Sequence, residues 1–485
     1  MSDLRVIESS SPVQVQPALC VDLDGTLVKS DTLWDSIFAL ARSHPGKLPL
    51  LPGWAFRGKA NLKAKISALA PLDAAHLPYN RAVVEFLRRE RAASRAIYLA
   101  TGADGALAER VAAYLGIFDG VLASDGATNL TGGRKLQKLE HRFGNAGFDY
   151  IGNAMPDLPL LSGARQAMLA NPSLRLSAAL KLKKIPVSQT FLDRSNPLVS
   201  IGSALRIHQW AKNVLLFLPL LLAHSLLWSR VTAAVEAFIC FCLAASATYI
   251  INDLLDLEAD RAHPAKKNRT FASGNLPVAA GLALTLALLA CAFFLASSLP
   301  PRFLAYLVLY LVTTLAYSFA LKRIVLVDVI VLSGLYTIRV LAGGAATGTL
   351  VSPWMGAFSI FLFLSLAMAK RFSELENLGQ RGMTSAKGRG YLVSDIEQLR
   401  SFGTTSAYAS VLVFALYING HDVTALYRHP DRMWLITPLM ILWVSRIWLL
   451  ASRGKLHEDP VVFALTDLMS LLIGAGVIVV ALLSV

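Results

Sequence analysis

The pattern of apolar and polar residues changes character near residue 190. Before this point, short apolar runs alternate with charged residues and glycines, whereas from about Asn213 long apolar segments are separated by short polar ones. About 20 mostly apolar residues are enough for a helix to cross a bilayer. The pattern therefore predicts a globular domain over residues 1–190 and an all-α, polytopic membrane domain over residues 191–485.

The second domain contains nine segments that are apolar enough to be candidate spans. They are 213–229, 231–251, 276–298, 302–320, 324–347, 352–369, 404–419, 433–450 and 461–484. The alternate loops 252–275, 320–323, 370–403 and 446–460 carry fifteen Lys and Arg, against four in the opposite set. Cytoplasmic loops carry the excess of Lys and Arg. We therefore expect a multi-pass protein of the inner (cytoplasmic) membrane, with its N-terminal domain and both long polar loops in the cytoplasm.

The composition supports a protein that lies in a lipid bilayer. The chain is 55% hydrophobic and 16% charged, and its net charge is +14. Positive loops of a membrane protein account for this charge, so we expect no nucleic-acid partner. The first 19 residues lack the basic and apolar regions of a cleavable signal. The cysteines have no metal-site spacing, and we expect buried free thiols at Cys20, Cys240, Cys242 and Cys291.

A dense charged segment, "NDLLDLEADRAHPAKKNR", follows the second span at residues 252–269. If the helix continues past Ile251, Asp253, Asp256 and Asp260 fall at i, i+3 and i+7 and share one face. Carboxylates gathered in this way repel one another unless a cation joins them, and Mg²⁺ prefers such oxygen ligands and bridges to phosphates. Asn252 can add an amide oxygen. The alternative is a charged helix end at the headgroup level, paired with the cations that follow it.

"NDLLDLEAD" resembles the first aspartate-rich motif, NDxxDxxxD, of the UbiA superfamily of intramembrane prenyltransferases. The extension "RAHPAKKNRTFASG" and the segment "RIHQWAKN" are similar to its polyprenyl-phosphate (decaprenyl-phosphate) phosphoribosyltransferase branch. The resemblance covers about residues 198–485. It implies Mg²⁺-dependent transfer of 5-phosphoribose from phosphoribosyl pyrophosphate to a polyprenyl phosphate. It also implies that Asp253 and Asp256 carry the catalysis.

The second long polar segment separates two branches of this superfamily. Enzymes with aromatic acceptors usually carry another aspartate-rich motif there, but this chain has "AKRFSELENLGQRG", with Glu374 four residues after Lys370. Cations at this position suit substrates that carry several phosphates. The candidate substrate-binding residues are Lys212, Asn252, Lys266, Lys267, Arg269, Tyr336, Arg339, Lys370, Arg371 and Glu374.

Arg339 lies inside the predicted span 324–347, in "YTIRVLAGG". An ionised side chain within a membrane is costly, and its usual explanation is functional. The alternative is a structural pairing with Asp328 or another carboxylate. Lys370 and Arg371 have an alternative too, as anchors at the membrane interface.

In the first domain, "CVDLDGTLVKSD" reads as a short strand that runs into an acidic turn. The run Asp22-Leu-Asp24-Gly-Thr26 resembles the signature of haloacid dehalogenase (HAD)-type phosphatases. The resemblance implies a Rossmann-like α/β fold with a helical cap at about 33–95. It also implies that Asp22 is the nucleophile, that Asp24 is the acid/base and that both help to hold Mg²⁺.

The remaining motifs of the HAD family follow in order. "IYLATG" supplies Thr101 as a phosphate-binding hydroxyl, and "GGRKLQKL" supplies Lys135, with Lys138 as the rival. "GNAMPD" resembles the metal motif GDxxxD, although Asn153 replaces its first acid while Asp157 remains. This departure leaves open a degenerate domain that only scaffolds or senses.

The combined hypothesis is a bifunctional membrane enzyme. The membrane domain would make a polyprenyl-phosphoryl phosphoribose for cell-wall precursor synthesis, and the tethered phosphatase would remove its 5-phosphate. One rival is a prenyltransferase that uses an isoprenoid diphosphate and an aromatic acceptor. Another is a transporter or lipid-binding protein with a regulatory HAD-like domain. The prenyl chain length and the oligomeric state stay open.

Overall fold

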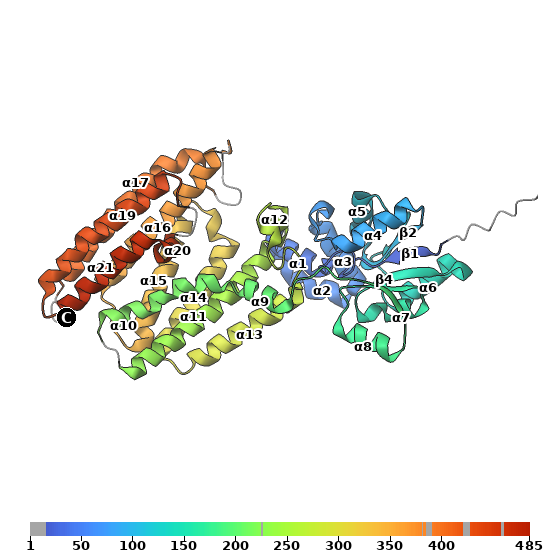
Figure 1. The fold of residues 1–485 in the computed structure, drawn as a ribbon, viewed down its shortest axis with the longest axis horizontal. Coiled ribbons are helices and arrows are strands. Elements are labelled where there is room, and N and C mark those ends of the chain that lie inside the picture. The colour runs from blue at the N-terminus through green and yellow to red at the C-terminus, as the bar shows by residue number, and fades with distance from the viewer. Residues whose placement is uncertain (1–15, 225–226, 381, 385–389, 421–426, 457–459) are drawn as a thin grey trace, which may run out of the picture. The chain divides into compact units, whose positions relative to one another are not determined.

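The computed structural model describes residues 16–224, 227–380, 382–384, 390–420, 427–456 and 460–485. Most of the N-terminal stretch expected to lack a signal, residues 1–15, lies outside this part, as do residues 381 and 385–389 of the second polar loop. The chain divides into two compact units (Figure 1). The first holds the residues up to Ala204 together with Asp253–Gly281, and the second holds Leu205–Asn252 and Leu282–Val485.

The first unit is built on a parallel sheet of six strands in the order β3-β2-β1-β4-β5-β6. The strands are β1 (Ala18–Val21), β2 (Ile97–Asp104), β3 (Gly120–Ser124), β4 (Phe148–Gly152), β5 (Ala167–Ala170) and β6 (Val187–Phe191). Strand β1 pairs with β2 on one side and β4 on the other. The first strand in the sequence therefore lies at the centre of the sheet, where the strand order reverses, which is where open α/β sheets bind their ligands.

Nine α-helices lie between residues 32 and 205, and several of them pack against the sheet and cover its apolar strands. They are α1 (Thr32–Ser43), α2 (Leu51–Phe56), α3 (Lys59–Leu69), α4 (Arg81–Ala92), α5 (Gly105–Leu115), α6 (Gly133–Phe143), α7 (Leu158–Gly163), α8 (Leu174–Leu182) and α9 (Pro197–Leu205). The first four lie between β1 and β2, where the helical cap was predicted. Fully buried Leu19, Val21, Leu99 and Ile151 form part of the core. The predicted α/β fold with a helical cap is confirmed.

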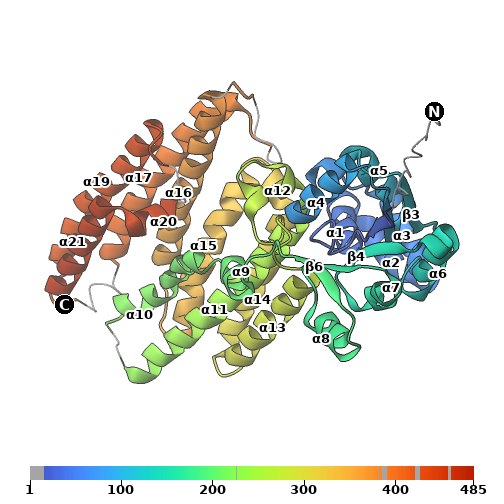
Figure 2. The same cartoon turned by 45° about the vertical axis from the view of Figure 1, so that its right-hand side comes forward.

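The second unit is helical throughout its described residues. Its main elements are η5 (Ile207–Phe217), α10 (Leu218–Leu222), α11 (Trp228–Leu255), α13 (Val278–Ala296), α14 (Pro301–Phe319), α15 (Val327–Thr347), α16 (Pro353–Gln380), α17 (Ile396–Ile418), α19 (Ile436–Ser452), α20 (Pro460–Thr466) and α21 (Leu468–Ser484). Helices α17, α19 and α21 run side by side in both views (Figures 1 and 2). The all-α membrane domain is confirmed as a fold.

Seven of the helices in the described residues are long and apolar enough to cross a membrane, fewer than the nine that we predicted. The predicted span 213–229 is replaced by the 3₁₀ helix η5 and the short helix α10, which begins next to Pro219. The predicted span 461–484 is divided at Asp467, whose side chain caps α21 by accepting a hydrogen bond from the Ser470 N–H at 2.8 Å. In both places residues that end or begin helices interrupt an apolar run.

Candidate functional site

The first cluster lies at the carboxyl end of the central strand β1. Asp22 directly follows this strand, and Lys135 of α6 donates from Nζ to Asp22 Oδ1 at 2.7 Å. The same Nζ donates to the Tyr150 hydroxyl at 3.0 Å, and Tyr150 in turn donates to Asp157 Oδ1 at 2.9 Å. Because β1 and β4 are adjacent and parallel, residues 113 or more positions from Asp22 in sequence converge on it.

Burial has the largest effect on the electrostatics of this cluster. Burial, together with the carboxylates of Asp157 and Asp24, raises the pKa of Asp22 to about 7, and Lys135 opposes this shift. Burial and the nearby Asp31 raise the pKa of Asp24 to about 6. Burial opposes the charge of Lys135, but Asp22 and Asp157 raise its pKa. Lys135 is therefore a buried ammonium held by two carboxylates.

The residues expected to hold Mg²⁺ in this unit differ in how many oxygens they leave available. Asp22 Oδ2 has no hydrogen-bond donor among the described residues, so it keeps an oxygen for a cation. Both Asp157 oxygens are engaged, because Oδ1 accepts from Tyr150 and Oδ2 accepts from the Asn153 and Ala154 N–H groups. The Asn153 amide packs against Gly25, where a Cβ would meet Nδ2 at 2.0 Å. Asp22 therefore keeps an oxygen suited to a metal, whereas the Asp157 oxygens serve mainly to order the loop.

The cap and the second strand supply further residues at this end of the sheet. Thr101 is fully buried in β2, and its Oγ1 accepts from the Ala103 N–H at 3.0 Å. Lys63 of cap helix α3 donates to the Gly102 carbonyl at 2.5 Å, a contact that sequence reasoning missed. Tyr150 was also missed, although it lies just before the recognised "GNAMPD". Lys138 lines a different surface hollow, so Lys135 is the lysine that reaches Asp22.

The aspartate segment does not form the single helical face that we predicted. Helix α11 ends at Leu255, and α12 (Leu257–Ala262) begins after Asp256, which has φ −92° and ψ 9°. Asp256 is the N-cap residue of α12, but its side chain makes no capping hydrogen bond, and its non-helical backbone separates the two helices. Asp253 therefore stands on α11 and Asp260 on α12.

Arginine side chains occupy the positions where a cation was predicted. Arg269 Nη1 lies 3.2 Å from Asp253 Oδ1 and 2.7 Å from Asp260 Oδ2. Asp256 pairs instead with Arg42 of α1. Within the described residues no three His, Cys, Asp or Glu side chains are preassembled as a metal site. Asp253 and Asp260 nevertheless supply oxygens around one cation position, which is the donor chemistry that Mg²⁺ needs.

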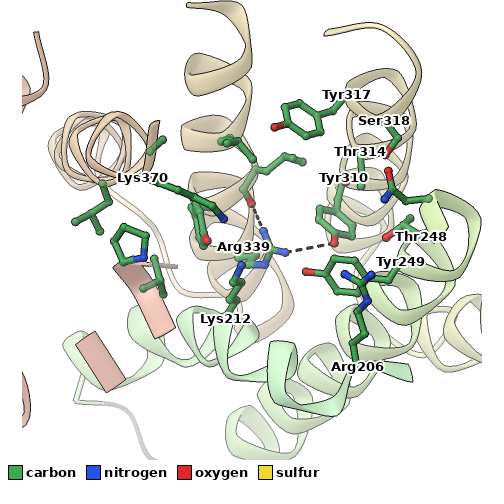
Figure 3. A pocket seen from close by; sticks show the side chains of 18 of the residues that line it. Arg206, Lys212, Thr248, Tyr249, Tyr310, Thr314, Tyr317, Ser318, Arg339 and Lys370 are labelled. Atoms are coloured by element: carbon green, nitrogen blue, oxygen red, sulfur yellow. Dashed lines mark hydrogen bonds between the residues drawn. The ribbon is translucent and has the colours of Figure 1, made fainter. Parts of the chain in front are cut away.

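A cavity of about 230 Å³ opens among the helices of the second unit (Figure 3). Its lining includes six of the predicted substrate-binding residues: Lys212, Asn252, Tyr336, Arg339, Lys370 and Arg371. Lys266, Lys267 and Arg269 belong to the first unit and are not among its lining residues. Arg206 and Tyr310 also line the cavity and were missed, although Arg206 opens the recognised segment "RIHQWAKN". The wall is thus rich in cations and tyrosines.

Arg339 lies in the centre of this cavity wall, as Figure 3 shows. Its Nε donates to Asn213 Oδ1 at 2.8 Å, and Nη2 donates to the Tyr310 hydroxyl at 3.3 Å. The guanidinium also stands over the rings of Tyr310 and Tyr336, with distances of 4.8 and 5.5 Å to the ring centroids. All these partners are neutral, so no carboxylate in the described part balances the charge of Arg339.

Arg371 is held in a different way. It donates from Nε to Asp328 Oδ2 at 2.7 Å and from Nη1 to Glu374 Oε2 at 2.5 Å. Its Nη2 donates to the Tyr317 hydroxyl at 3.3 Å. The suggested pairing of Arg339 with Asp328 is therefore wrong, because Arg371 takes that carboxylate. Arg371 has its charge balanced inside the protein, and Glu374 acts as its partner.

A close contact between α15 and η5 positions the residues that η5 contributes to the cavity wall. Gly343 of α15 lies against η5, where a Cβ would be 2.0 Å from the Leu216 carbonyl oxygen. The same 3₁₀ helix carries Lys212, whose Nζ is 5.8 Å from the Tyr336 ring centroid, and Asn213, which binds Arg339. Only glycine permits this approach, and the approach brings the η5 side chains to Arg339.

These features define a helical protein with a cavity lined by cations and tyrosines among apolar helices, joined to an α/β unit with a buried Asp–Lys centre. Residues 213–472 match the UbiA prenyltransferase family, and residues 19–162 match the haloacid dehalogenase-like hydrolases. The chain belongs to the UbiA prenyltransferase family, with a HAD-like domain fused to its N-terminal side. Together with the apolar helices, this membership makes it a multi-pass membrane protein.

Similar proteins cover either nearly the whole chain or a little over half of it. Uncharacterized protein y4nM of Sinorhizobium fredii is 39% identical and covers 98% of this chain and 92% of its own length. Nodulation protein NoeC of Azorhizobium caulinodans is 34% identical over 57% of this chain and 90% of its own. The decaprenyl-phosphate phosphoribosyltransferase of Mycolicibacterium smegmatis is 37% identical over 54% of this chain and 85% of its own.

One solved structure with a similar helical part is a UbiA homolog from Archaeoglobus fulgidus bound to DMAPP and Mg²⁺. It has a TM-score of 0.45 and 17% sequence identity, and the match covers 59% of this chain and 98% of that one.

Proposed function

We propose that this chain is a bifunctional enzyme of polyprenyl-phosphoryl sugar synthesis. Its helical domain transfers 5-phosphoribose from phosphoribosyl pyrophosphate to a polyprenyl phosphate, and its HAD-like domain then removes the 5-phosphate. The observation that carries the proposal is Arg339, an intramembrane cation whose described partners are all neutral. The similarity to decaprenyl-phosphate phosphoribosyltransferases supports the choice of substrates.

The cavity suits a substrate with several phosphate groups. Arg206, Lys212, Arg339 and Lys370 all line it, and Arg339 presents a planar guanidinium that can hold two phosphate oxygens at once. Asn213 and Tyr310 fix the orientation of that guanidinium without neutralising it. A charge desolvated among apolar helices attracts an anion more strongly than one in water. We assign Arg339 and Lys212 to the phosphates of the donor or the acceptor.

The transfer requires one bond to form and one to break. A phosphate oxygen of the polyprenyl phosphate attacks the anomeric carbon of the donor, and the bond from that carbon to the diphosphate breaks. The electron pair leaves with pyrophosphate. A phosphate monoester is already anionic, so no general base is needed, and the residues of the cavity contribute alignment and charge balance.

The aspartate segment is the proposed metal-binding part of this reaction. Asp253 follows Asn252 on α11, and Asn252 lines the cavity. Asp253 and Asp260 would hold Mg²⁺ in the position that Arg269 takes, with Asp256 beside them. The bound metal would neutralise charge that develops on the leaving pyrophosphate. Asp253→Asn is expected to abolish transfer.

In the HAD-like domain, we assign Asp22 as the nucleophile toward the 5-phosphate of the lipid product. Its carboxylate attacks phosphorus, the bond to the ribose 5-oxygen breaks, and Asp24 donates a proton to that oxygen. Water then hydrolyses the aspartyl phosphate and releases inorganic phosphate. Lys135 opposes the rise in the pKa of Asp22 that burial causes and would balance the phosphate charge, while Thr101 is assigned to phosphate binding.

The second candidate is a prenyltransferase that uses an isoprenoid diphosphate and an aromatic acceptor. The second polar segment speaks against it, because its acid Glu374 and the nearby Asp328 are both bound to Arg371. Because both carboxylates form ion pairs with Arg371, neither is positioned as a ligand of a second metal ion. A transporter or lipid-binding protein with a regulatory HAD-like domain would need no Mg²⁺ and would release no pyrophosphate, which separates it from both enzymatic candidates. By the distribution of Lys and Arg, we place the HAD-like domain in the cytoplasm.

The two enzymatic candidates can be separated with two donors. The purified full chain in detergent with Mg²⁺ is given polyprenyl phosphate with phosphoribosyl pyrophosphate, or an aromatic acid with an isoprenoid diphosphate. We expect pyrophosphate release only with the first pair, and no release by Asp253→Asn. Release only with the second pair would establish the rival candidate.

A further inference from the structure

The aspartate segment of the transferase packs with the HAD-like domain. Residues Asp253–Gly281 lie inside the region that matches the UbiA family, yet they form one compact unit with the N-terminal residues. We refer to Asp253–Gly281 as the aspartate loop. Three separate contacts, spaced along this loop, join it to residues of the phosphatase fold.

The first contact is a buried ion pair. Arg261 Nη1 of α12 lies 2.8 Å from Asp35 Oδ2 of α1, and the two side chains are only 3% and 0% exposed. Ser30 donates to the same Asp35 oxygen at 2.6 Å, and Arg261 Nε donates to the Ala272 carbonyl at 3.1 Å. A buried charge without its partner is strongly unfavourable, so this pair specifies how α1 and the loop fit together.

The second contact lies at the other end of α1. Arg42, in the last turn of this helix, pairs with Asp256 at the bend between α11 and α12. Asp256 is one of the motif carboxylates, and its pairing with Arg42 fixes where its oxygens lie. Arg42 is a residue of the phosphatase fold that orients a carboxylate of the transferase motif.

The third contact is made by backbone. Gly274 of the loop has φ +72°, and a Cβ at this position would be 2.7 Å from Cβ of Lys29. Lys29 follows the Asp22–Thr26 turn by only a few residues. The loop therefore touches the phosphatase fold before α1 as well as at both ends of this helix.

Helix α1 also begins at the phosphatase centre. The Thr32 N–H donates to Asp24 Oδ1 at 2.8 Å, and Asp31 caps the helix by accepting from the Leu33 N–H at 2.9 Å. One helix of 12 residues thus joins the acid/base candidate of one activity to the aspartates of the other.

We infer that the HAD-like domain has a second function besides hydrolysis: through α1 it holds the aspartate loop in the geometry that transfer requires. Asp35 and Arg42 are positioning residues for the transferase. This inference rests on the proposed function only for its catalytic consequence, because the packing itself is independent of any substrate.

The test compares hydrogen exchange and transfer in the full-length chain in detergent. The variants are Asp35→Asn, Arg42→Gln and the conservative Arg42→Lys. The control is Arg91→Gln, which breaks an exposed ion pair with Asp119 in the same unit. Exchange is followed in peptides from 253–275 and, as a check on folding, in peptides from β1 and β4.

We expect Asp35→Asn and Arg42→Gln to speed exchange in 253–275 while β1 and β4 stay protected. Transfer should fall roughly 10- to 100-fold, as when residues that orient metal ligands are removed. Arg42→Lys should recover part of both signals, and Arg91→Gln should change neither. Faster exchange in β1 would show that Asp35→Asn disturbs the fold of the whole unit. In that case the test relies on Arg42→Gln alone, because the Arg42 side chain is partly exposed.

Unchanged exchange of 253–275 in Arg42→Gln would overturn the inference. Faster exchange in 253–275 with no loss of transfer would also overturn it, because the loop would then not need to be held. If exchange responds as expected but the wild-type chain transfers no phosphoribose, the packing role stands and the proposed substrates are wrong.

Discussion

Two arginines of the membrane domain, Arg339 and Arg371, differ in the charge of their hydrogen-bond partners. Arg371 is bound by Asp328 and Glu374, so its charge is balanced within the protein. Arg339 is bound by an amide, a phenol and a carbonyl, and it stands over two tyrosine rings. The sequence indicates only that both are cations near membrane helices. Their partners lie between 3 and 126 positions away, and these partners decide which of them is set to bind an anion.

Arg339→Gln is therefore expected to impair transfer without unfolding the protein. Glutamine can keep a hydrogen bond to Asn213 but loses the charge, and hydrogen bonds to charged groups contribute about 1.5–3 kcal/mol. The value of kcat/KM for phosphoribosyl pyrophosphate should fall roughly 10- to 100-fold. The kcat/KM of Arg339→Lys should lie between those of the wild type and Arg339→Gln, because lysine keeps the charge but lacks the planar, forked guanidinium.

Arg371 provides the contrasting variant. Arg371→Gln leaves the buried Asp328 without its ionic partner, a loss of about 3–5 kcal/mol in stability. It should lower the thermal unfolding midpoint in detergent, and Asp328→Asn added to it should restore part of the loss. If Arg339→Gln instead unfolds the protein while Arg371→Gln only slows transfer, the roles assigned to the two arginines are reversed.

At the scale of elements, the close approach of α15 and η5 shapes the cavity. The contact depends on Gly343, whose Cβ position lies 2.0 Å from the Leu216 carbonyl oxygen, a backbone atom that no rotamer change can move away. Gly334 on the same helix has no atom within 4 Å of its Cβ position. A substitution at Gly343 therefore tests the contact, and the same substitution at Gly334 is its control.

Gly343→Ala should destabilise the protein by about 1–3 kcal/mol through overpacking. It should also slow transfer, because η5 carries Lys212 and Asn213. Gly334→Ala should leave both the unfolding midpoint and the rate of transfer close to wild type. Equal effects of the two substitutions would show that the η5 contact does not shape the cavity.

The elements also show how far the sequence pattern can be followed. The long apolar helices were predicted from the length of the apolar runs, and the α/β fold with its helical cap from the resemblance to the HAD family. The aspartate spacing wrongly predicted one continuous face, since spacing alone does not reveal that Asp256 ends a helix. The order of the HAD motifs was enough to predict Asp22 and Lys135 as site residues. Tyr150 and Lys63 could not be predicted in this way, because only the tertiary fold brings them to the site.

At the scale of the molecule, the HAD-like domain and the aspartate loop form one compact unit. Pairs such as Arg42 with Asp256 and Asp35 with Arg261 join residues more than 200 positions apart. No local pattern predicts such pairs. They explain physically why a phosphatase fold and an aspartate loop would be retained together, beyond the raised local concentration that a tether provides.

The central claim is that one chain both transfers phosphoribose and removes the 5-phosphate. The most direct test gives the purified chain Mg²⁺, polyprenyl phosphate and phosphoribosyl pyrophosphate labelled in the ribose, and then analyses the labelled lipid for its 5-phosphate. The wild-type chain should yield labelled lipid without that phosphate, and Asp22→Asn should accumulate the phosphorylated lipid. Lipid that keeps the phosphate in both proteins would contradict the phosphatase role, and an absence of labelled lipid in both would contradict the transferase itself.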